Sequence, residues 1–276
     1  MKFFQEKLYE YHSQVFSVDA VLHQSRTGFQ EVMIFENAFF GRVLVLDGVI
    51  QLTERDNHIY HEMIAHVPLL AHGSSRRVLI IGGGDGGTLK EVLKHPVDSV
   101  VMVEIDGEVI GLSKRYLPEI SGGAFDDPRA TVLVKDGMRY VAEGEAEFDV
   151  IIIDSTDPMG PGEALFSDSF YRDCRKRLRP GGIIAVQSGA PFFQPEELAM
   201  VRGRLSSCFG VASPYLAPVP TYAGGMLALV AAGEDADALC PPAALLKQRF
   251  SNLRGGTRYY TPEVHRAAFA LPPSFS

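Results

Sequence analysis

Carboxylate side chains follow four successive predicted strands, and they are the strongest chemical signal in the sequence. Asp85 stands in the glycine-rich stretch IIGGGDGG, Glu104 ends the next apolar run, and Asp136 ends the one after it. Asp154 and Asp157 follow the fourth run, VIIID. The carboxyl ends of parallel strands share one edge of a sheet, where ligands bind. A single acid at a strand end often only caps a helix, but four in a row predict a binding site at that edge.

The glycine-rich stretch has the spacing of a nucleotide-binding turn, with one residue that does not suit a phosphate. Gly82, Gly84 and Gly87 fit G-x-G-x-x-G, and Glu104 lies where an acid grips ribose hydroxyls. Asp85 opposes a pyrophosphate, because like charges 4 Å apart repel by about 1 kcal/mol in water and about 4 kcal/mol at intermediate dielectric. The loop therefore favours a cationic nucleoside, such as an adenosyl sulfonium with an aminopropyl arm.

Asp154 is the predicted general base because of the chain that precedes it. The run VIIID places this carboxylate at the end of a strongly apolar strand. Removal from water raises the pKa of a carboxyl group and a bound cation lowers it, so such a group can accept a proton. Asp136, together with the backbone of Gly137, is placed to accept the amino group of an adenine.

The first fifty residues predict a small antiparallel β unit. Apolar stretches rich in valine, isoleucine and phenylalanine span 14–27, 30–40 and 41–52, with turn residues between them. The following TERD resembles a capping box and predicts a helix that begins at Thr53. We therefore expect an N-terminal β-strand domain over residues 1–55.

Apolar runs alternate with helical patterns in the rest of the chain. Five runs are VLIIGG, SVVMVEID, ATVLVKDG, FDVIIIDSTDP and GGIIAVQSG, and GGMLALVAAG adds another strand near the C-terminus. Continuous apolar strands joined by helices predict a parallel sheet that is covered on both faces. We therefore expect residues 56–276 to form a Rossmann-like, doubly wound α/β domain.

The composition is that of a globular protein with a sizeable core. The 276 residues are 46% hydrophobic, and the net charge of −8 argues against a nucleic-acid partner. No apolar run is long enough to span a membrane, and the first residues are too polar for a signal peptide. Three scattered cysteines indicate reduced thiols. We therefore expect a cytoplasmic protein with neither a membrane nor a nucleic-acid partner.

The stretch HEMIAH resembles a zinc-binding helix but has one residue too many. His61 and His66 are five residues apart, so on a helix their side chains point about 140° apart. The other histidines form no convincing metal set. We therefore expect no metal site.

Blocks of sequence along nearly the whole chain carry a family resemblance. They are VLVLDGVIQLTERDNHIYHEMIAHVPL, VLIIGGGDGGTLKEVLKHP, VEIDGEVI, DDPRATVLVKDG, DSTDPMGP, PTYAGG and RYYTPEVHRAAFALP. In this order they resemble the spermidine synthases, of the polyamine aminopropyltransferase family. The resemblance implies a small N-terminal β domain and a domain like the class I methyltransferases. It also implies transfer of an aminopropyl group from decarboxylated S-adenosylmethionine, a co-substrate, to putrescine, without a metal or prosthetic group.

The resemblance also assigns roles to residues. Asp154 falls at the catalytic base, and the Tyr60 hydroxyl is expected to help it hold the attacking nitrogen. The predicted donor site, with the loop glycines, contains Gln30, Gly82, Gly84, Asp85, Glu104, Asp136 and Gly137. The predicted acceptor site contains Gln51, Tyr60, His61, Asp154, Asp157 and Tyr222. Some relatives have glutamine in place of His61. A homodimer or homotetramer, associated through the N-terminal region, is implied as well.

Three other functions fit parts of the sequence. They are an S-adenosylmethionine-dependent N-methyltransferase acting on a diamine, an NAD-binding dehydrogenase or nucleotide sensor, and a catalytically silent binding module. Asp85 disfavours the first two, because their ligands bring a carboxylate or a pyrophosphate to the loop. The presence of both Asp154 and Tyr60 argues against the third. The choice of acceptor among putrescine, cadaverine and longer amines stays open.

Overall fold

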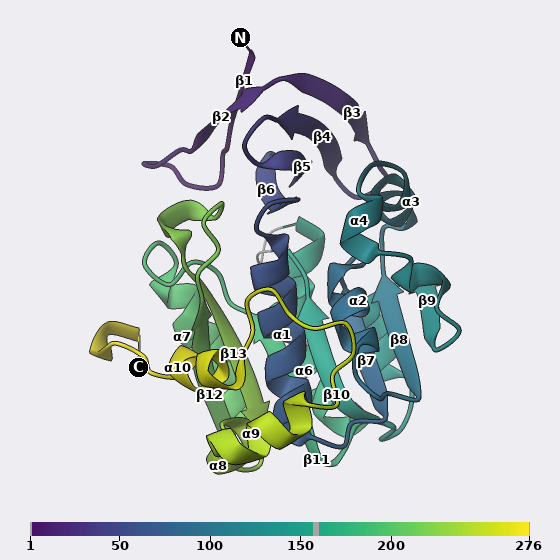
Figure 1. The fold of residues 1–276 in the computed structure, drawn as a ribbon, viewed down its shortest axis with the longest axis vertical. Coiled ribbons are helices and arrows are strands. Elements are labelled where there is room, and N and C mark those ends of the chain that lie inside the picture. Colours follow the sequence, from purple (N-terminus) through teal and green to yellow (C-terminus); the bar gives the residue numbers. More distant parts are fainter. Residues whose placement is uncertain (1, 157–159, 276) are drawn as a thin grey trace.

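The computed structural model describes residues 2–156 and 160–275. Its N-terminal part contains a two-stranded and a four-stranded antiparallel sheet, at the top of Figure 1. The strands are β1 (Lys2–Gln5), β2 (Val15–Val18), β3 (Ala20–Arg26), β4 (Glu31–Asn37), β5 (Gly41–Leu46) and β6 (Val49–Thr53). The predicted antiparallel unit is confirmed. β1 was not predicted, because it is mostly exposed and its sequence, KFFQ, lacks the alternation of a half-buried strand.

The two faces of the four-stranded sheet pack against different partners. Val32 and Ile34 of β4 form a core with Val109 of α3 (Gly107–Tyr116), which belongs to the larger domain. Phe35, the next residue, points to the opposite face and packs with Phe16 of β2. Successive side chains of a strand point to opposite faces. One face of the N-terminal sheet is therefore anchored on the larger domain, while the two-stranded sheet covers the other.

A seven-stranded sheet forms the centre of the larger domain (Figure 1). Its strand order is β12-β13-β11-β10-β7-β8-β9, and the pairs from β11 to β9 are parallel. The strands are β7 (Arg77–Gly82), β8 (Ser99–Glu104), β9 (Ala130–Val134), β10 (Phe148–Asp154), β11 (Leu178–Gln187), β12 (Val211–Ala217) and β13 (Leu227–Gly233). The Rossmann-like, doubly wound α/β fold that the alternating runs predict is confirmed.

Two features of this sheet differ from the expectation of a uniformly parallel arrangement. β13 runs antiparallel to both of its neighbours, β11 and β12. β12 was not predicted at all, because its sequence, VASPYLA, is interrupted by Pro214. Proline cannot donate a hydrogen bond to the ladder and is tolerated on edge strands. β12 occupies the edge of the sheet, which explains how the proline is accommodated.

Helices cover both faces of the central sheet. Residues of α1, α2 and the C-terminal helices share one core with Val78 and Ile80 of β7, whereas α5, α6 and α7 share another with Leu79 and Ile81. The helices are α1 (Asn57–His72), α2 (Gly87–Leu93), α3, α4 (Pro118–Ser121), α5 (Gly137–Ala142), α6 (Asp168–Arg177), α7 (Pro195–Phe209), α8 (Ala236–Leu239), α9 (Ala243–Phe250) and α10 (Pro262–Ala268). Short 3₁₀ turns are η1 (Ala124–Asp126), η2 (Gly160–Phe166), η3 (Ala223–Gly225) and η4 (Pro273–Phe275). Within the described ranges, no helix is long and apolar enough to cross a membrane.

The predicted start of the first long helix was wrong by one turn. Thr53 ends β6, and α1 begins at Asn57. The Thr53 hydroxyl donates to Oδ1 of Asp56 at 2.6 Å, and Oδ2 of Asp56 accepts the backbone N–H of Thr221 at 2.8 Å. Asp56 therefore links the two domains instead of completing a capping box. The division of the chain into domains 1–55 and 56–276 stays a prediction.

Candidate active site

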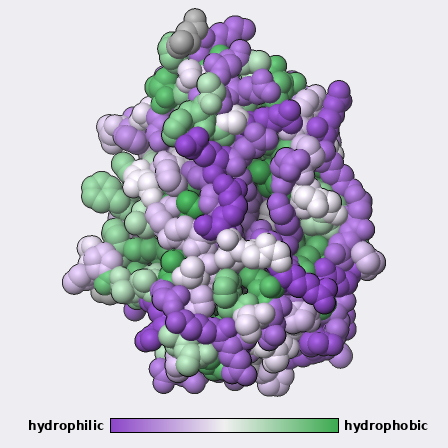
Figure 2. All heavy atoms as spheres, viewed as in Figure 1, coloured by the Kyte–Doolittle hydropathy of each residue, from purple (hydrophilic) through white to green (hydrophobic). Residues whose placement is uncertain are grey.

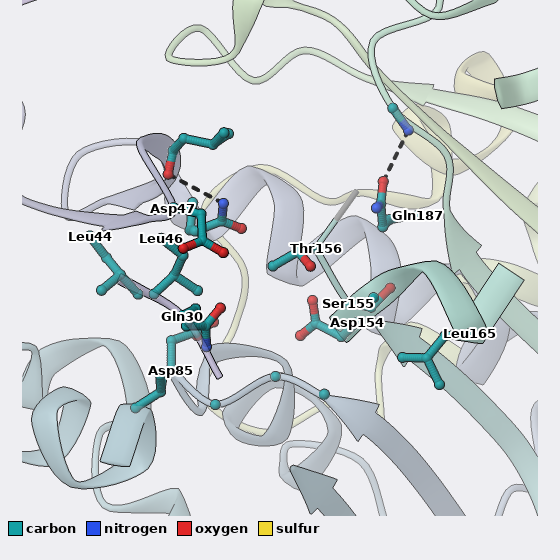
Figure 3. A pocket seen from close by; sticks show the side chains of 18 of the residues that line it. Gln30, Leu44, Leu46, Asp47, Asp85, Asp154, Ser155, Thr156, Leu165 and Gln187 are labelled. Atoms are coloured by element: carbon teal, nitrogen blue, oxygen red, sulfur yellow. Dashed lines mark hydrogen bonds between the residues drawn. The ribbon is translucent and has the colours of Figure 1, made fainter. Parts of the chain in front are cut away.

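A cavity of about 270 Å³ lies where the N-terminal unit meets the carboxyl edge of the central sheet. Side chains from both units line it, and Figure 3 shows Gln30 and Asp85 near one end, Gln187 near the other, and Asp154 between them. The predicted site residues that line this cavity are Gln30, Gln51, Tyr60, His61, Gly82, Gly84, Asp85, Glu104, Asp136, Gly137, Asp154 and Tyr222. Asp157 lies outside the described residues. The placement brings the predicted residues together, while their individual roles stay predictions.

The glycine-rich loop is held close to the neighbouring strand β10. The backbone N–H of Gly83 donates to the carbonyl oxygen of Asp154 at 2.8 Å. A Cβ atom on Gly82 would lie 2.1 Å from that same oxygen, and Gly82 has φ of +86°, so only glycine fits there. A Cβ atom on Gly84 would lie 3.1 Å from Oε2 of Glu104. The loop therefore lies against the backbone at the end of β10 and against the carboxylate of Glu104.

Asp85 pairs with His61, a contact that the sequence did not predict. Nε2 of His61 lies 3.1 Å from Oδ1 of Asp85, and the side chains are only 4% and 15% exposed. Burial is the largest single influence on His61 and would lower its pKa. The charge and hydrogen bond of Asp85, together with the charges of Asp154 and Glu91, outweigh burial and raise that pKa above its usual value. Burial likewise opposes ionisation of Asp85, yet His61 and the Gly87 N–H hold its pKa below the usual range. These contacts therefore keep Asp85 ionised.

The position of His61 depends on a glycine. A Cβ atom on Gly87 would lie 2.2 Å from Cε1 of the imidazole ring, so any larger residue would displace the ring. The helix α2 begins at Gly87, and the ring lies across its first turn. The family resemblance led to the prediction of His61 on the acceptor side, and that role stays a prediction. The structure places it against Asp85, a predicted donor residue.

Glu104 and Gln30 lie at the predicted donor end. Oε1 of Glu104 accepts the N–H of Asp106 at 2.9 Å, and burial raises the pKa of Glu104 to about 7. Nε2 of Gln30 donates to Oδ2 of Asp106 at 3.0 Å, and the Thr27 hydroxyl donates to the same oxygen at 2.6 Å. The turn between β3 and β4 is thus fixed to the loop after β8. These bonds bring Gln30 of the N-terminal unit into a site otherwise built by the central sheet.

Asp136 and Gly137 have structural roles besides their place in the cavity. Oδ1 of Asp136 accepts the N–H of Met138 at 2.8 Å, so this carboxylate caps α5. A Cβ atom on Gly137 would lie 2.6 Å from Cγ2 of Ile81, so the glycine permits close packing of α5 on β7. Both residues still line the cavity. The second carboxylate oxygen of Asp136 lies 3.8 Å from Nε of Arg139, in an ion pair at the start of the same helix.

Asp154 and Tyr60 form a short hydrogen bond at the middle of the cavity. The Tyr60 hydroxyl donates to Oδ1 of Asp154 at 2.5 Å, and both side chains are buried. Burial, reinforced by the nearby charge of Asp85, raises the pKa of Asp154. Oδ2 of Asp154 is buried and has no hydrogen-bond partner among the described residues. The pair therefore presents a basic oxygen to whatever occupies the cavity.

Several cavity residues beyond Asp154 were not predicted. The buried carboxylate of Glu6 accepts the N–H of Ile50 at 3.0 Å and a donor from Gln14 at 3.1 Å. The Tyr9 hydroxyl donates to Oε1 of Gln194 at 3.0 Å, which joins the segment after β1 to the loop after β11. Further unpredicted lining residues are Leu8, Ser155, Thr156, Leu165 and Gln187. Sequence periodicity does not reveal them, because all but Gln187, the last residue of β11, lie outside the strands.

Two residues of the predicted acceptor site, Tyr222 and Gln51, close the cavity on the acceptor side. The Tyr222 hydroxyl donates to the carbonyl oxygen of Gln51 at 2.6 Å, and Nε2 of Gln51 donates to the carbonyl oxygen of Val49 at 3.3 Å. Tyr222 stands between β12 and β13, so this bond links the central domain to β6. The cavity beyond Asp154 is therefore walled by both units of the chain.

The HEMIAH stretch is explained by packing. Glu62 accepts the backbone N–H groups of Arg258, Tyr259 and Tyr260 at 2.7 to 2.8 Å, which fixes the C-terminal segment onto α1. Nδ1 of His66 lies 2.9 Å from Nε2 of His95. Among the described residues, no group of three or more potential ligands is arranged to hold a metal ion.

Comparison with known proteins places the chain in a family. Residues 57–240 match the spermine/spermidine synthase domain, and residues 2–54 match the spermidine synthase tetramerisation domain. The polyamine aminopropyltransferase 1 of Pseudomonas aeruginosa is 52% identical over 99% of this chain and 96% of its own length. The polyamine aminopropyltransferase of Ruegeria sp. is 50% identical over 97% of this chain and 94% of its own length.

Solved structures that resemble this chain include two spermidine synthases. A spermidine synthase in complex with the transition-state analogue AdoDATO superposes with a TM-score of 0.93 at 38% identity, over 98% of this chain and 92% of that one. The spermidine synthase of Thermotoga maritima superposes with a TM-score of 0.90 at 36% identity, over 98% of this chain and 91% of that one. The chain belongs to the spermine/spermidine synthase family, whose members are polyamine aminopropyltransferases. It is thus a transferase, and its tetramerisation domain indicates a homo-oligomer.

Proposed function

We propose that the chain is a spermidine synthase (EC 2.5.1.16). It transfers the aminopropyl group of decarboxylated S-adenosylmethionine to putrescine, which gives spermidine and 5′-methylthioadenosine. One observation carries the proposal. An anionic carboxylate, Asp85, occupies the glycine-rich loop of a nucleotide-type fold and faces the same cavity as the buried Asp154–Tyr60 pair. Such a site suits a cationic nucleoside and an amine that must lose a proton.

The charge of the donor fits the predicted donor end. Decarboxylated S-adenosylmethionine carries a sulfonium and an ammonium, and it lacks the carboxylate of the intact molecule. Asp85 receives the ammonium, and Glu104 accepts the ribose hydroxyls. The adenine lies near Asp136 and Gly137, which line the cavity at the end of β9. Gln30 closes this end from the N-terminal unit.

The acceptor must be deprotonated before it can react. Putrescine is a dication near neutral pH, because free alkyl amines have a pKa of about 10. Asp154 accepts a proton from one ammonium, and the Tyr60 hydroxyl helps to hold that nitrogen. A raised pKa makes Asp154 a better base than an exposed carboxylate. Asp157 is the candidate that holds the second ammonium at the far end. Glu6 is another carboxylate that lines the cavity.

The group transfer itself requires little further assistance. The nitrogen lone pair attacks the carbon next to sulfur, and the carbon–sulfur electron pair returns to sulfur. Methylthioadenosine leaves as a neutral thioether, and the new secondary amine retains the positive charge. The main task of the site is to align two cations that repel each other, and its carboxylates serve that task. The proposed chemistry uses neither a metal nor a prosthetic group.

Two further parts of the proposal concern the setting of the enzyme. The cytoplasm is the proposed location, because all three cysteines are free thiols. The proposed assembly is a homodimer or homotetramer built through the N-terminal unit, which the match to a tetramerisation domain supports. Small-molecule substrates are the expected partners of the site, with no role for nucleic acid.

An acceptor panel tests the proposal. Decarboxylated S-adenosylmethionine is offered with putrescine, cadaverine, spermidine or agmatine, and released methylthioadenosine is measured. We expect the highest kcat/KM with putrescine and spermidine as its product. A higher value with cadaverine would assign the same transfer to another amine. Absence of methylthioadenosine with every amine would contradict the proposed function.

A further inference from the structure

The donor end of the cavity contains a charge that the proposed reaction does not use. Both proposed substrates are cations, and Asp85 is the carboxylate that receives the donor's ammonium. Yet Nε2 of His61 already lies 3.1 Å from Oδ1 of Asp85, and the imidazole ring is almost completely buried. A protonated imidazole and an ammonium on the same carboxylate repel each other. The site must therefore change its charge when the donor binds.

The ring cannot avoid this by moving away. It lies across the first turn of α2, within the space that a Cβ atom on Gly87 would occupy. Its neighbour Tyr60 is fixed by the hydrogen bond to Asp154. The ring of His61 also packs edge-on against Tyr60, with the ring centroids 5.4 Å apart. Displacing the imidazole would disturb the Asp154–Tyr60 pair.

The groups that face His61 come from four parts of the fold. Asp85 contributes from the loop after β7, Glu91 from α2, and Asp154 from the end of β10. Tyr60 and His58 belong to α1 itself. Three carboxylates therefore surround one imidazole, with Asp85 in direct contact. Their combined charge stabilises the protonated ring in the free protein, and an arriving ammonium removes that stabilisation.

We propose that His61 is a positioning residue for the donor's amine, which holds Asp85 as an ion pair in the free protein and loses one proton when the ammonium binds. The inference rests on the proposed function, because it assumes a donor with a cationic arm. The proton leaves Nδ1 for the solvent, and Nε2–H continues to donate to Oδ1 of Asp85. The other carboxylate oxygen of Asp85 then receives the ammonium. The charge of the His61–Asp85–ammonium group is thus zero both before and after binding.

This exchange makes donor binding depend on pH with a definite sign. A proton on His61 and the donor's ammonium compete for the charge of Asp85, so donor affinity falls as the pH drops through the pKa of His61. Because Asp85 raises this pKa above its usual value of 6.5, the loss begins on the neutral side of that value. Well below it, affinity falls about tenfold per pH unit, as expected for release of one proton. Methylthioadenosine lacks the aliphatic amine of the aminopropyl arm and does not exchange a proton with His61.

Calorimetry of the full-length protein tests the proposal. Decarboxylated S-adenosylmethionine, without an acceptor, and methylthioadenosine are each titrated at pH 6.5 in buffers of different ionisation enthalpy. The buffer dependence of the heat gives the number of protons released. Glu104, with a pKa of about 7, faces the ribose in both ligands, so its contribution cancels in the difference. We expect the donor to release more protons than methylthioadenosine, by a difference approaching one.

The variant His61→Gln provides the matched comparison. Its amide keeps a donor for Asp85 but cannot titrate, so the difference between the two ligands should fall to zero. Equal proton release by both ligands in the unsubstituted protein would overturn the inference, whatever the variant does. An undiminished difference in His61→Gln would overturn it too. If decarboxylated S-adenosylmethionine does not bind at all, the proposed function fails rather than the role of His61 alone.

Discussion

Asp154 and Tyr60 share one short hydrogen bond at the centre of the cavity. Substitution of Asp154 should therefore affect the chemical step much more than donor binding. We expect Asp154→Asn to lower kcat by about 100- to 10,000-fold, the usual contribution of a positioned acid or base. Donor affinity should stay within a few-fold, because the donor's polar groups meet other residues. Methylthioadenosine release and calorimetry give the two quantities. Loss of donor binding as large as the loss of kcat would show that Asp154 binds the donor rather than activating the amine.

Glu104 gives a second prediction for a single residue, because burial raises its pKa to about 7. A carboxylate that accepts ribose hydroxyls must be ionised, so methylthioadenosine binding should weaken as the pH falls from 8 to 6. The Kd should rise about tenfold for each unit well below the pKa. Glu104→Gln should bind more weakly and without this dependence. A Kd that does not change with pH in the unsubstituted protein would place the ribose elsewhere.

The strand-end acids could be predicted from the sequence, but their contacts could not. Strand spacing alone places Asp85, Glu104 and Asp154 at one edge of the sheet, because parallel strands end together. The pairing of His61 with Asp85 depends on the packing of α1 against the first turn of α2, which is a contact between separate elements. The acceptor role predicted for His61 came from the family resemblance, whereas its contact with Asp85 follows from the fold.

The segment between β1 and β2 is the least predictable element of the site. It carries no periodic pattern, yet it places Glu6, Leu8 and Tyr9 in the cavity wall. Tyr9 stacks on Phe193 with the ring centroids 4.9 Å apart and donates to Gln194. Contacts with a loop distant in sequence hold this segment in place. The regular strands of the central sheet were predictable because their burial on both faces leaves continuous apolar runs.

A substitution in this segment should weaken binding of the acceptor and leave binding of the donor unchanged. Tyr9→Ala removes both the ring contact and the hydrogen bond to Gln194 from the wall beyond Asp154. We expect the KM for putrescine to rise about tenfold, the effect of about 1.4 kcal/mol. The KM for the donor should not change. Steady-state kinetics with each substrate varied in turn give both values.

Tyr11 supplies the matched control for this prediction. It is a tyrosine in the same segment, but its side chain is 93% exposed and it does not line the cavity. Tyr11→Ala should leave both KM values unchanged. If the two variants behave alike, the segment acts through general stability and not through the wall of the cavity.

At the scale of the whole molecule, the N-terminal unit exposes two apolar side chains on its outer face. Phe3 and Val15 lie on the same side of the β1–β2 sheet, opposite Phe4 and Phe16, and are 63% and 60% exposed. Figure 2 shows hydrophobic residues among hydrophilic ones over this unit, at the top of the molecule. This unit matches the tetramerisation domain. Exposed apolar side chains of this kind mark contact surfaces.

We therefore expect Phe3→Asp combined with Val15→Asp to reduce the oligomer to a smaller species. Burying a charge in a protein interface is costly, so association should weaken while each subunit keeps its fold. Light scattering coupled to size exclusion gives the mass, and circular dichroism checks the fold. Leu245→Asp, on α9 of the larger domain, is the control and should leave the mass unchanged. An unchanged mass in the double variant would place the interface elsewhere.

The central claim is that Asp85 selects a donor with a cationic arm and so directs aminopropyl transfer. The most direct measurement compares decarboxylated and intact S-adenosylmethionine, each with putrescine, by mass spectrometry of the products. We predict spermidine and methylthioadenosine from the decarboxylated donor only. Asp85→Asn should lower kcat/KM for that donor by about 10- to 100-fold, the value of a hydrogen bond to a charged group. N-methylputrescine from the intact donor would contradict the account and identify a methyltransferase.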